Sequence, residues 1–181
     1  MASHVRPIVV ARELSRYLGA VALLLVAAVH AQQYYDAYFS AVPTIGTLFM
    51  LDIVGAGAAG LVLLAPVGLL RVRLADAIFI VGALTGIAVA AGSFAALVIS
   101  EYMPLFGFME SGYRLAIVLS LLFEGLATLA LAVFVVTLVL GRRSVGRAPG
   151  MLVGVAGPAA KLAHRTGAAV GASVGQGRSM R

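Results

Sequence analysis

The chain has 181 residues, of which 62% are hydrophobic and only 11% are charged, and it contains no cysteine. Soluble domains are about 45–50% apolar and about 25% charged, so this composition excludes an ordinary soluble globular protein and a disordered one. The absence of cysteine also excludes a disulfide framework, a thiolate zinc site, an iron–sulfur cluster and a cysteine nucleophile.

Four segments are apolar over the length of about 20 residues that a helix needs to cross a bilayer. They predict membrane-spanning helices over residues 17–38, 45–70, 75–100 and 115–140. We therefore expect an all-α membrane protein, a bundle of four transmembrane helices over residues 17–140. Residues 1–16 precede it, and residues 141–181 form a basic tail rich in Gly, Ala and Arg that we expect to be cytoplasmic and disordered.

The basic residues indicate how the bundle is oriented. Twelve of the thirteen Lys and Arg residues flank one side of the predicted spans, and only Arg114 lies on the other side. Because short segments rich in Lys and Arg stay in the cytoplasm, we expect both termini to be cytoplasmic and the protein to span the bacterial cell membrane. Contact of the basic side with anionic lipid explains the net charge of +6 without nucleic-acid binding.

The first span has a second interpretation. Arg12 and Arg16, the apolar stretch 18–29 and the small-residue site Val29-His30-Ala31 resemble a cleavable signal peptide. Cleavage there would leave three spans in the same orientation. The apolar and aromatic character continues to Phe39, which favours a retained membrane anchor.

Two segments on the predicted outer side, 32–44 and 101–114, are apolar and aromatic rather than polar. Tyrosine at headgroup level keeps its ring in lipid and its hydroxyl in water. We therefore expect both segments to lie in the membrane interface and to cap the bundle. Arg114 should pair there with Glu110, because residues four apart in a helical turn are neighbours, and Glu101 and Asp36 are the alternative partners.

Small residues predict where the helices pack. Lipid supplies no hydrophobic drive between helices, so residues that let two backbones approach closely become important. Gly55 and Gly60 have this role in the second span, and Gly82 and Gly86 have it in the third. These glycines are expected to mediate packing within the bundle or to form the seam of a homodimer.

Two acidic residues lie deep in the predicted spans. Asp52 is about 10 Å and Glu124 about 14 Å inside its span, at 1.5 Å of rise per residue. A charge in the hydrocarbon is costly, so such residues are by default candidates for a functional site. Ser120, Glu124 and Thr128 follow one another at a spacing of four and therefore share one face of the fourth span.

The other spans also carry polar faces, which are richest in the outer half. His30 ends the first span, and Glu101 ends the third. Turning the polar faces inward places His30, Asp52, Glu101 and Glu124 around one outward-facing pocket. The third span would contribute Thr85, Ser93 and Ser100.

This polar cluster has three interpretations. A protonated Glu124 and a neutral His30 could form a hydrogen bond between helices with a purely structural role. Two carboxyl groups beside a histidine could instead share protons or hold a cation. A divalent metal is the third interpretation, with His30, Asp52, Glu124 and Met50 as weak candidate ligands. No cofactor is predicted.

The stretch His30-Ala-Gln-Gln-Tyr-Tyr, followed by Pro43-Thr-Ile-Gly-Thr-Leu-Phe-Met-Leu-Asp52, resembles small four-span membrane proteins of actinobacteria, most of them uncharacterised. The shared pattern is a histidine that ends span one, a group of aromatic residues, and a Pro-x-Ile-Gly-x-Leu-Phe-x-Leu run that begins span two. An asparagine often stands in place of Asp52, so the resemblance does not imply a charge there. It implies the four-span plan over residues 1–140 and no activity.

We therefore expect a multi-pass membrane protein, most simply a non-enzymatic accessory or structural component with a homodimer or a membrane complex as candidate partner. The first alternative is a small proton, cation or metal carrier that uses the predicted pocket. The second is a membrane redox or quinone-binding protein, which the missing cysteines and the single histidine within the spans disfavour.

Overall fold

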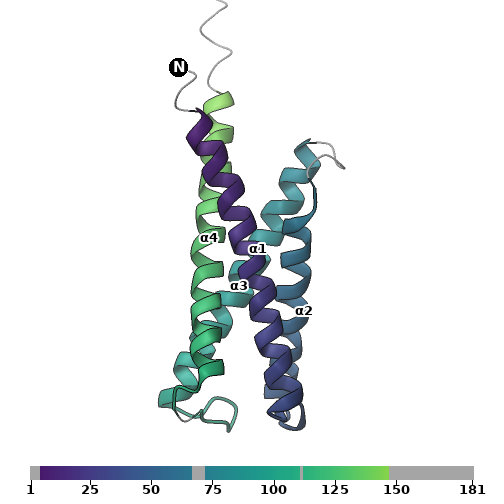
Figure 1. The fold of residues 1–181 in the computed structure, drawn as a ribbon, viewed down its shortest axis with the longest axis vertical. Coiled ribbons are helices and arrows are strands. Elements are labelled where there is room, and N and C mark those ends of the chain that lie inside the picture. The colour runs from purple at the N-terminus through teal and green to yellow at the C-terminus, as the bar shows by residue number, and fades with distance from the viewer. Residues whose placement is uncertain (1–4, 67–71, 111, 147–181) are drawn as a thin grey trace, which may run out of the picture. The chain divides into compact units, whose positions relative to one another are not determined.

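The computed structural model describes residues 5–66, 72–110 and 112–146. Within these ranges four long helices form, and no strand is present. Each helix contains a stretch that is long and apolar enough to cross a membrane, so the predicted all-α fold of four helices of membrane-spanning length is confirmed for the described residues. The elements in chain order are α1 (Val5–Asp36), the short 3-10 helix η1 (Phe39–Ala41), α2 (Ile45–Leu64), α3 (Val72–Tyr102) and α4 (Leu115–Gly146) (Figure 1).

Several helix boundaries differ from the prediction, and two of the differences have a cause in the local sequence. α1 begins at Val5 rather than near Tyr17, because the charged residues before the apolar stretch are good helix formers and extend the helix beyond it. α2 ends at Leu64 rather than near residue 70. Pro66 follows two residues later, and the residue before a proline is disfavoured in the helical conformation.

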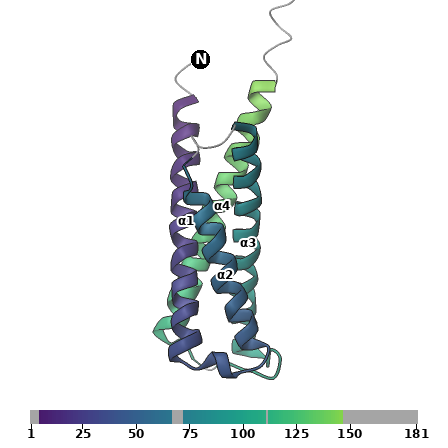
Figure 2. The same ribbon diagram turned by 90° about the vertical axis from the view of Figure 1, so that its right-hand side faces the viewer.

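Residues up to Leu140 form one compact unit, and a second unit begins at Gly141. Of the second unit only residues 141–146, the last turns of α4, are described, so the predicted disorder of the tail lies outside the described residues. In the first unit the helices alternate in direction. η1 and the segment between α3 and α4 lie at one end, here named the η1 end, and α1 begins at the opposite end (Figures 1 and 2).

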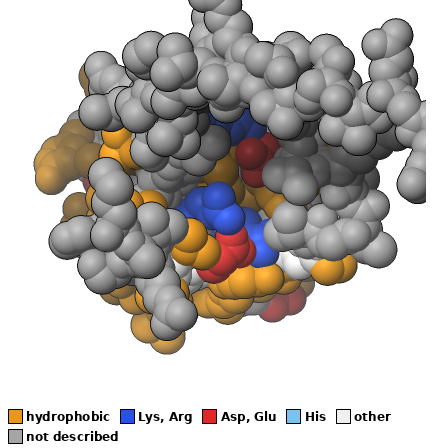
Figure 3. Space-filling model, turned by 90° about the horizontal axis from the view of Figure 1, so that it is seen from above, with side chains coloured by type: hydrophobic (Ala, Val, Ile, Leu, Met, Phe, Trp, Pro, Cys, Tyr) orange, Lys and Arg blue, Asp and Glu red, His pale blue; other side chains and the backbone are white. Residues whose placement is uncertain are grey.

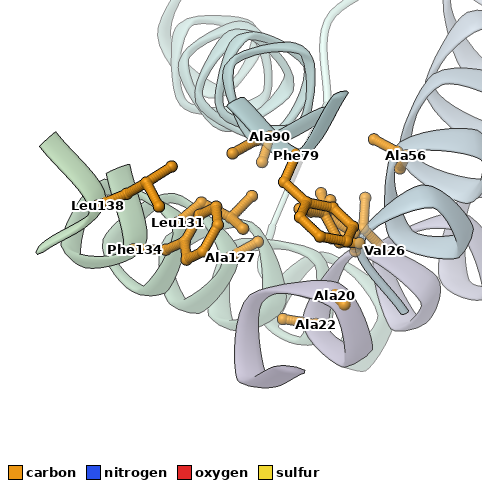
Figure 4. Packing of buried hydrophobic residues seen from close by; sticks show 14 of the residues in the cluster. Ala20, Ala22, Val26, Ala56, Phe79, Ala90, Ala127, Leu131, Phe134 and Leu138 are labelled. Atoms are coloured by element: carbon orange, nitrogen blue, oxygen red, sulfur yellow. The ribbon is translucent and has the colours of Figure 1, made fainter. Parts of the chain in front are cut away.

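The apolar core occupies the half of this unit that is remote from the η1 end. Side chains from all four helices meet there, and α1 packs along α2 while α2 packs along α3 (Figures 2 and 4). Alanine is frequent in the core. This is expected in lipid, where the hydrophobic effect does not hold helices together and small residues let them pack closely. The largest fully buried members of this core are Leu23, Leu63, Leu131 and Phe134.

The four glycines predicted to mediate packing all lie against neighbouring helices of the same chain. A Cβ atom on Gly60 would lie 3.1 Å from the Ala20 carbonyl oxygen of α1, and one on Gly55 would lie 3.0 Å from Val89 of α3. A Cβ on Gly82 would lie 3.1 Å from Val62 of α2. Gly86 faces both Leu23 of α1 and Leu131 of α4.

The end of the bundle where α1 begins carries basic and acidic side chains next to one another (Figure 3). Arg16 is only 1% exposed, and its Nη1 donates to the carbonyl oxygens of Leu63 at 2.9 Å and Ala65 at 3.3 Å. Its guanidinium also bonds Glu13 at 2.9 Å and lies over the ring of Phe79. Arg16 thus satisfies carbonyls at the C-terminus of α2 that have no partner within that helix.

Candidate functional site

A cavity of about 300 Å³ occupies the half of the bundle towards the η1 end. Its walls come from all four helices, from η1 and from the segment that joins α3 to α4. Most of the wall is apolar, and the polar side chains His30, Asp52 and Ser93 lie on it at the level where the cavity meets the core. The sequence places these three residues within the membrane spans of α1, α2 and α3.

His30 is the centre of the polar group. It is 5% exposed, and its Nδ1 lies 2.9 Å from the carbonyl oxygen of Val26, one turn earlier in α1. A carbonyl can only accept a hydrogen bond, so Nδ1 carries a proton and donates it there. The other ring nitrogen, Nε2, points into the site and lies 3.2 Å from the Ser93 hydroxyl of α3.

Two carboxyl groups approach the same nitrogen from different helices. His30 Nε2 lies 3.6 Å from Asp52 Oδ2 of α2 and 3.5 Å from Glu124 Oε1 of α4. Three titratable side chains and Ser93 therefore meet around one atom. The two His–carboxyl distances exceed the 2.7–3.2 Å of a well-formed N–H···O bond, so these contacts are electrostatic rather than tight hydrogen bonds.

Glu124 is fully buried, and neither of its carboxyl oxygens has a hydrogen-bond partner among the described residues. Ser120, one turn away, lines the cavity, whereas the Thr128 hydroxyl is buried on the opposite side of Glu124 and also lacks a partner within the described part of the chain. A second unpartnered acceptor is Gln33 Oε1, on a side chain that lines the cavity and is 9% exposed. Buried polar atoms are nearly always satisfied in native proteins, so a bound molecule or water is expected here.

Glu101 does not join the cluster that we predicted for it. It is absent from the described cavity wall, although its neighbour Ser100 is present. Tyr102 and, to a smaller extent, Glu101 raise the pKa of the Tyr113 hydroxyl, which places Glu101 near the segment between α3 and α4. The rotation of α3 thus presents Ser100, and not Glu101, to the described cavity wall.

The rim of the cavity at the η1 end carries the ion pair that the sequence predicts. Arg114 Nη2 bonds both carboxyl oxygens of Glu110 at 3.1 and 3.0 Å. The Glu110 side chain is 10% exposed and that of Arg114 is 51% exposed. Both residues line the cavity, and their charges compensate each other.

Aromatic rings cover one side of the cavity. Phe39 of η1 stacks on Phe49 of α2 with ring centres 4.8 Å apart and planes inclined by 10°. Phe108 meets Phe39 edge-to-face, and the His30 ring lies 5.2 Å from Phe49. These rings form a continuous aromatic wall from the rim to the polar cluster, defined here as Phe108, Phe39 and Phe49.

The geometry gives little support to the metal interpretation. No group of three or more His, Cys, Asp or Glu side chains in the described ranges is arranged to hold a metal ion. Met50, the fourth candidate ligand, is not among the residues found to line the cavity.

Sequence reasoning underrated three contributors to the site. Ser93 lies on the predicted polar face of α3, yet nothing distinguishes it there from Thr85, which is exposed on the surface. Gln33 could have been found, because it follows His30 by three residues and therefore shares its face. The aromatic wall carries no sequence signal, since phenylalanine is equally suited to contact with lipid.

The fold and the site together define a multi-pass α-helical membrane protein with a His/carboxyl cluster beside a cavity. No protein-family model, curated protein or solved structure matches the chain. Its function therefore has to be argued from the geometry of this cluster and cavity.

Proposed function

We propose that the protein is a proton-coupled cation carrier of the bacterial cell membrane that exchanges protons at His30, Asp52 and Glu124. The observation that carries this proposal is the convergence of three titratable side chains from three helices on one histidine nitrogen beside an open cavity. An accessory or structural protein needs no such convergence and no cavity next to it.

Both termini are proposed to be cytoplasmic. Twelve of the thirteen basic residues belong to the N-terminal segment, to the connection between the second and third spans, or to the chain after the fourth. Such segments stay in the cytoplasm, where they also meet anionic lipid. With this orientation the η1 end and the cavity face the outside, and the apolar core lies between the cluster and the cytoplasmic end of the bundle.

The number of protons that the cluster holds decides its charge. The proton on Nδ1 of His30 is committed to the Val26 carbonyl, which leaves three positions: Nε2, Asp52 and Glu124. The cluster is electrically neutral when two of these three positions are protonated, and it becomes negative when one proton leaves. Because net charge is costly within a membrane, the departing proton is best replaced by another positive charge. This coupling is the physical basis of the proposed exchange.

Glu124→Gln and Asp52→Asn should each abolish exchange while the protein remains folded. Either change keeps the size of the side chain but removes one of the two carboxyl groups on which release of the proton and binding of the cation are proposed to depend. The measurement is proton flux, reported by a pH-sensitive dye trapped in proteoliposomes, when a cation gradient is applied. Both variants should fall to the level of empty liposomes.

Glu101→Gln is the matched control for this experiment. It makes the same chemical change in the same half of the bundle but outside the cavity wall. Its flux should equal that of the unchanged protein. Full flux in Glu124→Gln and Asp52→Asn, with size-exclusion profiles like that of the unchanged protein, would overturn the proposal, and so would an equal loss in all three variants.

A further inference from the structure

The cavity wall and the polar cluster beside it contain buried hydrogen-bond acceptors without partners. Gln33 Oε1 and both carboxyl oxygens of Glu124 are buried without hydrogen-bond partners among the described residues. Two nearby donors are already engaged: His30 Nδ1 donates to Val26, and the Ser100 hydroxyl donates to the Leu97 carbonyl at 2.8 Å. A ligand with several N–H donors would satisfy the unpartnered acceptors.

The charges around the cavity indicate that the ligand is positive. The cluster contains two groups that can be negative, the carboxyl groups of Asp52 and Glu124, and one group that can be positive, the imidazole of His30. The only guanidinium on the described wall, that of Arg114, is compensated by Glu110. An anion would thus meet carboxyl groups with no free cation to balance them, whereas a cation compensates a carboxylate directly.

The wall composition disfavours a bare inorganic ion. Small hard cations such as Mg²⁺ and Ca²⁺ need about six to eight oxygen ligands to replace their hydration shell. Most of this cavity wall is apolar, and its stacked pair Phe39 and Phe49 leads directly to His30. Apolar and aromatic surface suits the hydrocarbon part of an organic ion, and aromatic faces also attract a cationic head.

The cavity also reaches the surface that would face lipid. Leu51 of α2 and Ala88 and Gly92 of α3 line it, and all three residues lie within the spans and are exposed. A Cβ atom added to Gly92 would meet nothing within 4 Å. A molecule dissolved in the membrane can therefore reach the cavity from the side, between α2 and α3.

From these observations we infer that the cavity binds an amphiphilic organic amine in its ammonium form, with the apolar part against the aromatic wall and the N–H groups directed to Gln33 and the buried carboxyl groups. This inference rests on the proposed function and names its substrate class. When the ammonium group arrives, one proton leaves the cluster, so that the site stays neutral. The exchanged cation is then the amine itself.

Tryptamine is a suitable probe, because the chain contains no tryptophan and the indole fluorescence reports the ligand alone. Titrating purified protein in detergent with tryptamine should shift the emission to shorter wavelength as the indole enters the apolar cavity. Tryptophol replaces the ammonium group with a neutral hydroxyl and should bind at least about tenfold more weakly, the factor that one charge-assisted hydrogen bond corresponds to. The trimethylammonium analogue, which lacks N–H donors, should also bind more weakly than tryptamine. Equal binding of tryptamine and tryptophol would overturn the inference.

Two leucine variants of α3 test the location of the site without touching the cluster. Gly92→Leu places a side chain into open space at the mouth of the cavity, so it should fold normally and reduce tryptamine binding. Ala95→Leu adds a similar volume to an exposed position of the same helix outside the described cavity wall and should bind tryptamine like the unchanged protein. Unchanged binding by Gly92→Leu would place the amine elsewhere and would contradict the inference.

Calorimetry in buffers of different ionisation enthalpy separates this inference from the proposed function. Binding of tryptamine with release of a proton supports both. Binding at this site without proton release supports the amine site but contradicts proton exchange. Proton flux driven by an inorganic cation, combined with no tryptamine binding, overturns the amine inference and leaves the carrier proposal standing.

Discussion

Replacing Arg16 with methionine should lower the free energy of unfolding by about 2–4 kcal/mol, the range for losing charge-assisted hydrogen bonds of a buried group. The change keeps most of the side-chain volume but leaves the carbonyl oxygens of Leu63 and Ala65 without their donor. It also removes the buried partner of Glu13 and the cation that lies over the Phe79 ring. Denaturant titration in mixed micelles, followed by circular dichroism, measures the loss.

Arg12→Met is the matched control for this prediction. Arg12 bonds the same Glu13, but its side chain is 35% exposed whereas that of Arg16 is 2% exposed. Exposed ion pairs contribute about 0–1 kcal/mol, so the control should unfold almost like the unchanged protein. Equal losses in the two variants would show that Arg16 acts only as one more positive charge at the membrane surface.

Gly86→Leu should also destabilise the bundle, by about 1–3 kcal/mol or more, as overpacking of a tight contact does. A Cβ at this position would lie 2.6 Å from Leu23 Cδ1 and 2.9 Å from Leu131 Cδ1, so both buried leucine side chains would have to shift to admit a leucine between α1 and α4. The same unfolding titration measures the effect.

Gly92→Leu makes the identical substitution on the same helix, in open space, and should leave the unfolding free energy almost unchanged. The pair separates loss of packing from a general penalty or benefit of placing leucine in α3. If Gly86→Leu unfolded like Gly92→Leu, the close approach of three helices at Gly86 would not exist in the protein.

Much of the fold could be predicted from the sequence because crossing a membrane imposes a local requirement. Each span has to satisfy its own backbone hydrogen bonds and to present apolar side chains over a fixed length, and both demands are met within one segment. The four helices, and the depth of Asp52 and Glu124 in them, therefore followed from composition alone. The ends of the helices were predicted less accurately. The apolar pattern does not register the proline that follows α2, Pro66, or the charged helical turns of α1 that precede Tyr17.

The candidate site was predictable only in part. His30, Asp52 and Glu124 could be proposed as neighbours, because polar side chains within spans turn away from lipid. Glu101 satisfied the same argument but lies apart, since the rotation of α3 presents Ser100 to the cavity instead. The burial of Arg16 had no sequence signal either, because a basic residue at the start of a span equally suits the cytoplasmic surface.

The amino-acid sequence by itself determines that this chain is a four-span membrane protein, and its basic residues predict the orientation, since both depend on the transfer of single segments into lipid. Only the tertiary structure decides which polar atoms meet, because that depends on the rotation and spacing of helices that are distant in the chain. It brings two carboxyl groups to one nitrogen of His30, leaves the acceptors of Gln33 and Glu124 unpaired, and encloses Arg16. The few charged residues of the chain thus have two roles. The basic residues that flank the spans predict the orientation, whereas Arg16, Asp52 and Glu124 make buried contacts that only the packing of the helices creates.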